Sequence, residues 1–544
     1  MNDFKKLPDI PSEGQTPLVQ ELIQIILDLQ EVVRDLHDEI LRLKGLKGRP
    51  KIKKSNMDDS STPLSEGNDE KAADDDGSSA SNDTEKKDGR KKSSKPKQSK
   101  NATLSIHKTE KVSIDAPSGA KFKGYKEFTV QDLIIQSHNT RYLLEQWETA
   151  NGDYVIAKAP AELMGGHFGP TLISFIIDQH FGQRVTQPSL LEQLKCMGVE
   201  ISYGQLSRIL TSDRHGFHEE KDAILQAGIE SSNYLQVDDT GARHAGKNGY
   251  CTFVGNEFFS WFRSSESKSR INFLDILGGN RPEYVLNAGA LEYIAGYKLP
   301  QHHLKALDIE QQFVDKKSWE EFLDQKGITG PRHRIIATEG AMIGRMLSSG
   351  FPTKMTILSD GAGQFNVFDH ALCWIHAERG ILKLNPISDD RKAAVESARK
   401  QIWGLYADLK LYKLAPDLHK SLVQEIRNRF DELCTTTTCY PDLNDALKRL
   451  HRNKDELLRV LDKPWIPLHN NLSESDIREY VQKRKISGGT RSEEGRRCRD
   501  TFASLRKTCR KHGVSFWEFL KDRIGQLNQI PLLSDVIRNA AHAL

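Results

Sequence analysis

The stretch Tyr234-Leu235-Gln236-Val237-Asp238-Asp239-Thr240-Gly241 is a short apolar run that ends in two adjacent carboxylates and a turn sequence. A second run, Thr356-Ile357-Leu358-Ser359-Asp360-Gly361, has the same form. Short apolar runs bounded by turn residues are typical of buried strands. We therefore expect two strands, each presenting an aspartate near its end, Asp238 on the first and Asp360 on the second.

Carboxylates presented by strands are suited to hold Mg²⁺, a hard cation that takes oxygen ligands. Two such ions clamp the attacking and leaving oxygens of an in-line phosphoryl displacement, and that chemistry needs a third carboxylate. Glu474, at the predicted start of a helix, is the candidate. Each residue also has a plainer interpretation, because an aspartate after a strand is commonly a turn residue and a glutamate in a first turn is favoured by the helix dipole.

The order of elements around these runs predicts an α/β fold. Strand, strand, strand, helix, strand is the order expected from the runs Tyr234–Val237, Tyr250–Val254, Phe258–Phe262, Glu266–Leu277 and Lys354–Leu358. Residues of about 280–350 are too many for a simple connection and are expected to form an inserted subdomain. Residues 387–462 have helical periodicity throughout, which predicts an all-helical insertion between the two parts of the core, 231–386 and 463–544.

Two short apolar-periodic segments, Leu190–Met197 and Tyr203–Leu210, are separated by a turn that contains Gly198, with Ser202 as a possible cap. The pattern is typical of a helix-turn-helix, although any pair of antiparallel helices has a similar one. We predict a helical DNA-binding region at 161–230, preceded by a small module at 105–160 that contains no cysteine.

The N-terminal part of the chain differs from the rest. Apolar residues from Leu22 to Leu43 recur at alternating spacings of four and three, which predicts a coiled-coil helix within residues 1–46. An amphipathic helix packed on its own protein is the alternative. Residues 47–104 are polar, with basic and acidic runs, and are expected to be a disordered linker because they offer little apolar surface to bury.

The composition of the 544 residues excludes several classes of protein. Lys and Arg number 78 and Asp and Glu 75, so the net charge of +3 neither favours nor excludes a polyanionic partner. No run approaches the roughly 18 apolar residues of a membrane span, and the first residues, MNDFKKLPDIPSEG, lack the apolar h-region of a signal peptide. Seven cysteines without a C-x-x-C pair predict reduced thiols, and we expect a soluble cytoplasmic protein.

Four motifs occur in one order along the chain: VDDTG at 237–241, ILSDGAGQF at 357–365, CWIHAERG at 373–380, and HNNLSESDIR at 469–478 followed by KRKISGG at 483–489. Together they resemble the insertion sequence 66 family of bacterial DDE transposases, over roughly Gly165–Leu520. The resemblance implies an RNase H-like catalytic core, a mixed sheet with flanking helices, in a bacterial protein associated with the nucleoid.

The same resemblance implies that Asp238, Asp360 and Glu474 are catalytic and bind two Mg²⁺ ions, with Mn²⁺ as a possible substitute. The expected reaction is cleavage at the terminal inverted repeats of a mobile element, followed by attack of the freed 3′-hydroxyl on target DNA. Asp239 stands where the family usually has Glu, and His469 and Ser475 stand where it usually has Asp and Arg. An inactive relic that still binds DNA and an RNase H-like nuclease without strand transfer are the alternatives.

Residues Asn470–His512 carry twelve Lys or Arg against six Asp or Glu, which suits a DNA backbone, although a solvated helix face is the alternative. The predicted DNA-binding residues are His376, Arg379, Arg478, Lys483, Arg484, Lys485, Arg491, Arg496 and Arg497. The C-x-x-H spacing of Cys373 and His376 suits zinc, but without a second pair a structural role is expected, with Trp374 in the core and with His376 and Arg379 facing the site or the DNA. We also expect a homodimer or higher homo-oligomer through the N-terminal helix, and possible accessory proteins of the same element.

Overall fold

The computed structural model describes residues 105–158, 160, 166–279, 281–417 and 419–543. The predicted coiled-coil helix and the charged linker lie outside these residues. The chain divides into two compact units, Met1–Thr129 and Val130–Leu544, which we describe separately. In the first unit, residues 105–129 contain a turn in which Ala120 N–H donates to the Pro117 carbonyl, and neither helix nor strand.

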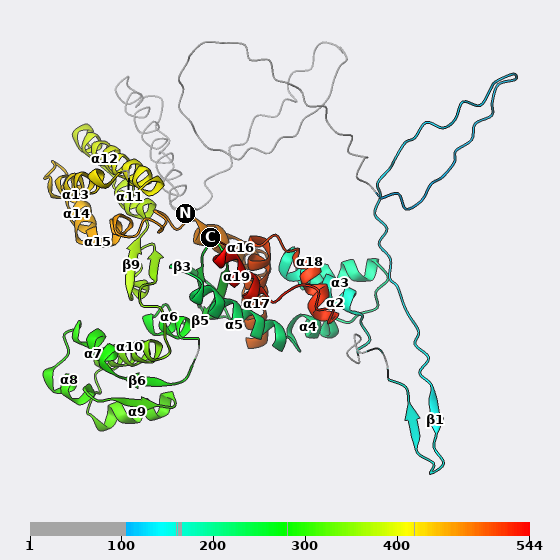
Figure 1. Ribbon diagram of the computed structural model, residues 1–544, viewed down its shortest axis with the longest axis horizontal. Coiled ribbons are helices and arrows are strands. Elements are labelled where there is room, and N and C mark those ends of the chain that lie inside the picture. The colour runs from blue at the N-terminus through cyan, green and yellow to red at the C-terminus, as the bar shows by residue number, and fades with distance from the viewer. Residues whose placement is uncertain (1–104, 159, 161–165, 280, 418, 544) are drawn as a thin grey trace, which may run out of the picture. The chain divides into compact units, whose positions relative to one another are not determined.

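The second unit is built on a five-stranded mixed sheet with the order β5-β4-β3-β8-β9 (Figure 1). Its strands are β3 (Tyr234–Gly241), β4 (Tyr250–Gly255), β5 (Ser260–Ser265), β8 (Thr356–Ser359) and β9 (Asp369–Leu372). The pairs β3–β4 and β4–β5 are antiparallel, whereas β3–β8 and β8–β9 are parallel. The predicted α/β class is therefore confirmed, with the first aspartate run on the central strand.

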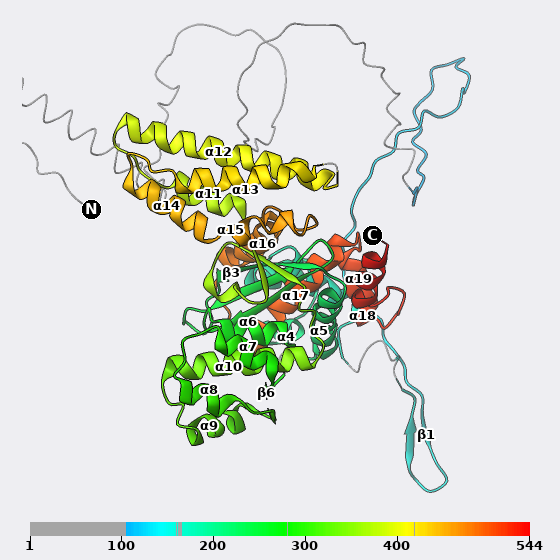
Figure 2. The same ribbon diagram turned by 60° about the vertical axis from the view of Figure 1, so that its left-hand side comes forward.

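Helices from both halves of the chain pack on this sheet. They are α5 (His215–Glu230), α6 (Arg270–Leu277), α11 (Trp374–Leu382), α16 (Asn471–Ser487) and α17 (Glu493–Lys511). Helix α16 packs on β3 and α17 on β5, and Figure 2 shows α5 and α17 beside the strands. The helix that carries Glu474 is thereby placed next to the strand that carries Asp238.

The outer edge of β5 is covered by side chains of α17. Three backbone N–H groups of β5 donate to that helix: Ser260 to Thr508 Oγ1 (3.2 Å), Phe262 to Ser504 Oγ (2.9 Å) and Ser264 to Asp500 Oδ2 (2.6 Å). The period of two along the strand matches a period of four along the helix, because residues four apart share a helix face. These three backbone N–H groups of the edge strand are thus hydrogen-bonded without a further strand.

Residues 280–350, expected to form an inserted subdomain, have a hydrophobic core of their own. The elements are β6 (Tyr284–Leu286), α7 (Ala288–Ala295), α8 (Gln301–Leu307), β7 (Gln311–Phe313), α9 (Lys316–Gln325) and α10 (Pro331–Ser348). Trp319 stacks on Tyr284 at 5.6 Å between ring centroids and is buried. Gly344 lets α10 approach β6 closely, since a Cβ there would lie 2.3 Å from the Val285 carbonyl oxygen.

Residues 387–462, expected to be helical throughout, form a second cluster with its own core. Its elements are α12 (Asp389–Leu414), α13 (Lys420–Thr435), α14 (Pro441–Arg452), α15 (Lys454–Leu457) and a 3-10 turn at Arg459–Leu461. Both views show α12, α13 and α14 side by side (Figures 1 and 2). Trp374 of α11 anchors this cluster to the sheet, because its indole N–H donates to the Leu457 carbonyl at 2.7 Å.

The predicted helix-turn-helix segments are α3 (Gln187–Cys196) and α4 (Tyr203–Thr211). Ser202 and Gln205 form a reciprocal capping box at the start of α4. Around them lie α2 (Pro170–Ile177), a π-helical turn at Asp178–Gly182, α18 (Phe516–Ile524) and α19 (Leu533–His542). Leu190 and Leu206 share one hydrophobic core with residues of the sheet and of α17, so this region packs directly on the sheet.

The remaining described segment contains the hairpin β1 (Gln146–Glu148) and β2 (Tyr154–Ile156), whose side chains are exposed. All seven cysteines are free thiols. Among the described residues, no helix has the length and apolar character needed to cross a membrane.

Candidate active site

The sheet topology brings the two aspartate runs together. Strands β3 and β8 are parallel neighbours, with Gln236 opposite Leu358. On each strand the aspartate therefore lies two residues beyond this pair. Asp238 lies within β3 and is half-buried, whereas Asp360 directly follows β8 and is exposed. Residues 122 positions apart in the sequence therefore lie at the same end of the two neighbouring strands.

Glu474 lies in the first turn of α16, the helix that packs on β3. The backbone N–H of Ser473 donates to the side-chain oxygen of Gln236 at 3.3 Å, and this bond fixes the start of α16 over β3. Burial raises the pKa of Asp238 to about 7; the backbone N–H of Asp239 opposes the shift, and the carboxylates of Asp360, Asp239 and Glu474 add to it. The structure thus brings Asp360 and Glu474 within electrostatic reach of Asp238.

Asp239 has different surroundings from its neighbour, since successive side chains of a strand point to opposite faces. Its Oδ1 accepts from the hydroxyl of Thr252 at 2.5 Å and its Oδ2 from the amide of Gln364 at 2.7 Å. Burial raises the pKa of Asp239, although both hydrogen bonds and nearby Lys268 act in the opposite direction. Both carboxylate oxygens of Asp239 are therefore occupied by protein donors, whereas Asp238 accepts from the backbone N–H of Asp239.

The loop after β8 holds Asp360 in a tight turn. Asp360 Oδ1 accepts from the Ala362 N–H at 3.1 Å, and Gly361 has a φ of 94°, in the region that favours glycine. Behind the loop, the hydroxyl of buried Ser359 contacts the His370 Nε2 atom at 2.9 Å. His370 Nδ1 contacts Glu456 of α15 at 2.9 Å, so the helical cluster of residues 387–462 supports the loop from one side.

Two of the predicted DNA-binding residues contact the third carboxylate instead. Arg379 Nη1 lies 3.3 Å and His376 Nε2 3.4 Å from Glu474 Oε1. Arg379 and His376 both come from α11, and all three side chains are partly exposed. In this conformation Glu474 is paired, and the described residues contain no group of three or more His, Cys, Asp or Glu arranged to hold a metal ion.

The chemistry of the donor set nevertheless fits a hard divalent cation. Asp238, Asp360 and Glu474 supply oxygen ligands, which Mg²⁺ and Mn²⁺ prefer. Asp238 is a buried carboxyl among like charges, and a cation beside it would favour its ionised form. Near them, the side-chain amide of Asn470 is fully buried with neither its oxygen nor its nitrogen hydrogen-bonded.

The remaining predicted DNA-binding residues follow the face of α16 and the start of α17. Four of them are exposed: Arg478, Lys485, Arg491 and Arg497. Arg484 and Arg496 are partly exposed, and Arg484 donates to the Thr240 hydroxyl at 3.4 Å, two residues beyond Asp238 on the same strand. Arg484 therefore lies beside the strand that carries Asp238, whereas Arg496 pairs with Glu493 at 2.6 Å.

Lys483 departs from that expectation because the structure places it inside the protein. Its side chain is 6% exposed and donates to the His180 backbone carbonyl, and burial, with Arg499 and Arg184 adding, lowers its pKa to about 7. The helical period explains the difference, since Asp476, Tyr480 and Lys483 share the inward face of α16.

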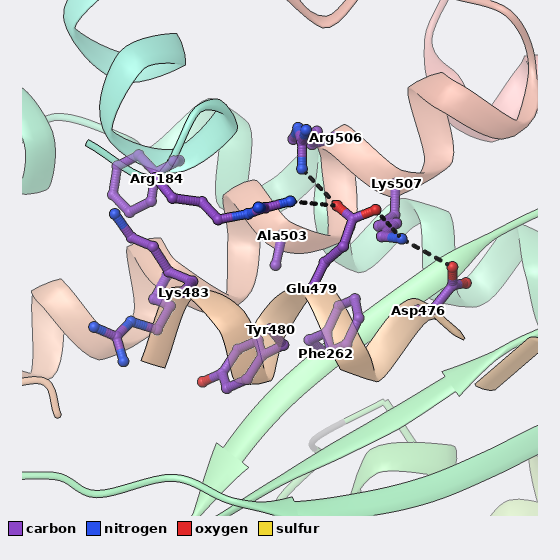
Figure 3. A pocket seen from close by; sticks show the side chains of 11 residues that line it. Arg184, Phe262, Asp476, Glu479, Tyr480, Lys483, Ala503, Arg506 and Lys507 are labelled. Carbon is purple, nitrogen blue, oxygen red and sulfur yellow. Dashed lines mark hydrogen bonds and ion pairs between the residues drawn. The ribbon is translucent and has the colours of Figure 1, made fainter. Parts of the chain in front are cut away.

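Much of the positive charge in this region is used within the fold. Figure 3 shows Glu479 of α16 facing Arg506 and Lys507 of α17, at 2.7 and 2.8 Å. Arg510 lies 2.7 Å from the same carboxylate, and Asp476 contacts Lys507 at 3.2 Å. The sequence count of basic residues therefore overstated the surface available to DNA.

Sequence reasoning missed two residues that hold the site together, Gln364 and Arg270. Gln364 belongs to the ILSDGAGQF motif, so a signal was present, but its contact with Asp239 spans 125 positions. Arg270 begins α6 and donates to the Gly363 carbonyl at 2.6 Å. Its partners lie 23 to 93 positions away, and no local pattern marks it.

Comparisons with known proteins agree with the motif pattern. The model of the IS66 transposase family matches residues 339–497, a range that includes Asp360 and Glu474. The chain is also 44% identical over 307 residues to the uncharacterized protein y4jO of Sinorhizobium fredii (strain NBRC 101917 / NGR234). That match covers 56% of this chain and 95% of the relative.

Proposed function

Because this chain belongs to the IS66 family of transposases, we propose that it cuts DNA at the ends of a mobile element and joins the 3′-hydroxyl to target DNA. One observation carries the proposal. Asp238 and Asp360 stand two residues beyond a paired position of the neighbouring parallel strands β3 and β8, and the charges of Asp360 and of Glu474, in the first turn of α16, both add to the raised pKa of Asp238. The mixed sheet with flanking helices also supports an RNase H-like core.

In this proposal, Asp238, Asp360 and Glu474 hold two Mg²⁺ ions, with Mn²⁺ as a substitute. When bound, the pair supplies charge stabilisation to the attacking and leaving oxygens of an in-line phosphoryl displacement. The protein contributes position, because the pairing of β3 with β8 brings Asp238 and Asp360 to neighbouring strands, and the Ser473–Gln236 hydrogen bond holds the start of α16, with Glu474, over β3. Asp239, whose oxygens are already occupied, supports the loop instead of binding metal.

The side chains that contact Glu474 have a second task. Arg379 pairs with Glu474 and His376 contacts it in this conformation, and both become available to a DNA phosphate when Glu474 turns toward Asp238. Arg484 and the exposed Arg478, Lys485, Arg491 and Arg497, together with Arg496, then bind phosphates along the strand, as basic side chains do on any polyanion.

The remaining parts of the proposal concern assembly. Helix α4, with Tyr203 and Arg208 exposed, is placed to read the terminal inverted repeats. The heptad segment between Leu22 and Leu43 would join two or more protomers, because two element ends must be held together. Removal of residues 1–46 should therefore leave a monomer in light-scattering measurements, and an unchanged mass would exclude this mode of assembly. Accessory proteins of the same element are possible partners.

The decisive experiment is strand cleavage and strand transfer on labelled terminal-repeat DNA with Mg²⁺. Asp238→Asn and Asp360→Ala should each lower the cleavage rate by at least about 1,000-fold, since each removes a metal ligand. Asp239→Asn is the matched control, and should stay within about tenfold of the parent, because the amide oxygen can still accept from Thr252 and the amide N–H can donate to Gln364 once the Gln364 amide turns over.

The outcomes separate the proposal from its alternatives. DNA binding without metal-dependent cleavage would identify an inactive relic, which the departures at His469 and Ser475 would explain. Cleavage without a joined product would identify a nuclease. Cleavage by Asp360→Ala at the parental rate would contradict the carboxylate assignment. Circular dichroism of every variant distinguishes loss of activity from loss of fold.

A further inference from the structure

The inserted subdomain of residues 280–350 makes a polar connection to the loop that carries Asp360. The connection is the guanidinium of Arg270, at the start of α6. Its Nη1 donates to the hydroxyls of Tyr293 (3.0 Å) and Tyr297 (2.6 Å) and lies 3.4 Å from Glu339 Oε2. Its Nη2 donates to the backbone carbonyl of Gly363 at 2.6 Å. One side chain therefore joins two helices of the subdomain to the loop.

The environment of Arg270 makes this connection a constrained one. Its side chain is 19% exposed and that of Glu339 is 6% exposed, so the pair is largely withdrawn from water. Burial acts to lower the pKa of Arg270, but the net pKa is raised because Tyr293, Glu339 and Tyr297 stabilise the charged form. Tyr293 donates in turn to Glu339 at 2.7 Å, so Arg270, the two tyrosines and Glu339 form one network.

The carbonyl that Arg270 holds lies between the two contacts that shape the loop. On one side, Asp360 accepts from the Ala362 N–H at 3.1 Å. On the other, the side chain of Gln364 donates to Asp239 at 2.7 Å. Holding Gly363 therefore fixes both the turn that presents Asp360 and the contact that ties the loop to β3.

We propose that the 280–350 subdomain sets the position of Asp360, and that Arg270 is the positioning residue through which it acts. Arg270 touches neither substrate nor metal; it works through the Gly363 carbonyl. A planar guanidinium can contact the subdomain with one nitrogen and the loop with another, whereas an ammonium group cannot span both. The inference rests on the proposed function, because the effect of the loop is read through Asp360 as a metal ligand.

The test compares Arg270→Gln and Arg270→Lys with a control that perturbs the same subdomain. Arg334→Gln is that control, since Arg334 pairs with Asp324 between α10 and α9, away from the loop. Two quantities are measured on the full-length protein: amide hydrogen exchange of residues 360–366 without metal or DNA, and the Mg²⁺ concentration that gives half-maximal cleavage.

Both Arg270 variants should speed exchange of the loop and raise the half-maximal Mg²⁺ concentration by about tenfold, the scale seen when outer-shell partners of a metal site are removed. Arg334→Gln should change neither. Tyr297→Phe, which removes one acceptor without loss of volume, should give a smaller shift in the same direction.

Each other outcome overturns the inference or the proposed function, and the two are distinguishable. A parent protein that shows no cleavage contradicts the proposed function. An active Arg270→Gln variant with parental loop exchange, or with faster exchange but a parental Mg²⁺ requirement, overturns the inference and leaves a purely structural bridge. If Arg270→Lys has the parental loop exchange and the parental Mg²⁺ requirement, the inference is also overturned, because a positive charge alone would then suffice.

Discussion

Asp238 and Asp239 are adjacent in sequence, yet the fold gives them different tasks. Strand geometry turns the two carboxylates to opposite faces, and that of Asp239 accepts from Thr252 and Gln364. The choice between them is thus a matter of orientation, which a sequence of two consecutive aspartates does not contain. The same holds for Lys483, which is basic by sequence and buried by helical period.

At the residue scale, we predict that Glu479 stabilises the fold in a pH-dependent way. Burial would raise its pKa, but Lys507, Arg506 and Arg510 outweigh burial and hold the pKa below its ordinary value of 4.5. A carboxyl with a lowered folded-state pKa contributes stability above its unfolded-state pKa and loses it as pH falls through the folded-state value.

Replacement of Glu479 by Gln should therefore cost about 2 kcal/mol at pH 7, because several charge-assisted contacts are lost. The difference from the parent should shrink as the pH is lowered below about 4.5, because the carboxyl of the unfolded chain takes up a proton there before the carboxyl of the folded protein does. Urea unfolding at pH 7, 5 and 3.5 measures it. Glu518→Gln, at an exposed pair with Lys521, should change stability by less than about 0.5 kcal/mol. A constant difference over this pH range would contradict the explanation.

At the scale of elements, the sequence predicted the regular segments well and their connections poorly. Apolar runs at Tyr234, Tyr250 and Phe258 marked β3, β4 and β5 to within a few residues, because buried strands need such runs. The strand β9 and the β6–β7 pair have only four and three residues per strand, too short for a periodic signal.

The candidate site was predictable only in part for the same reason. Motif order pointed to the three carboxylates, which are local features of the chain. The pairing of Glu474 with Arg379 and the bridge made by Arg270 depend on contacts between distant segments, 95 and up to 93 positions apart. Contacts of that kind follow from packing and are absent from local patterns.

We also predict that α10 of the inserted subdomain has no room for a side chain at Gly344. Gly344→Ala should destabilise the protein by about 2 kcal/mol, since overpacking against backbone forces helix and strand apart. Gly404→Ala in α12 is the control, and should be neutral or stabilise by about 0.5 kcal/mol because its nearest neighbour is a flexible arginine tip. Thermal unfolding compares the two, and equal effects would contradict the packing argument.

At the scale of the whole molecule, the net charge of +3 does not show that basic residues differ in what they contact. Some basic residues of the C-terminal region hold α16 to α17, Lys483 is buried against His180, and others remain exposed. Two subdomains flank the site: the helical one reaches the Asp360 loop through Glu456 and His370, and the 280–350 one through Arg270.

The surface residues should control the salt dependence of DNA binding. If Lys485 contacts a phosphate, Lys485→Gln should lower the slope of log affinity against log salt concentration by about one. Arg510→Gln is the control, because Arg510 is 65% exposed but already paired with Glu479. Fluorescence anisotropy at several salt concentrations measures both slopes. Equal slopes for Lys485→Gln and the parent would remove Lys485 from the DNA-binding surface.

The cover that α17 provides for β5 has a consequence for synthesis of the chain. An open strand edge is a template for pairing with other chains. The side chains that close this edge lie 236 to 248 positions after the strand, so a ribosome must finish almost the whole protein before they arrive. A chain that ends before Asp500 lacks the side chains that cover β5, so its edge strand keeps unpaired N–H groups. We expect such truncated chains to aggregate or to occupy chaperones in the cell.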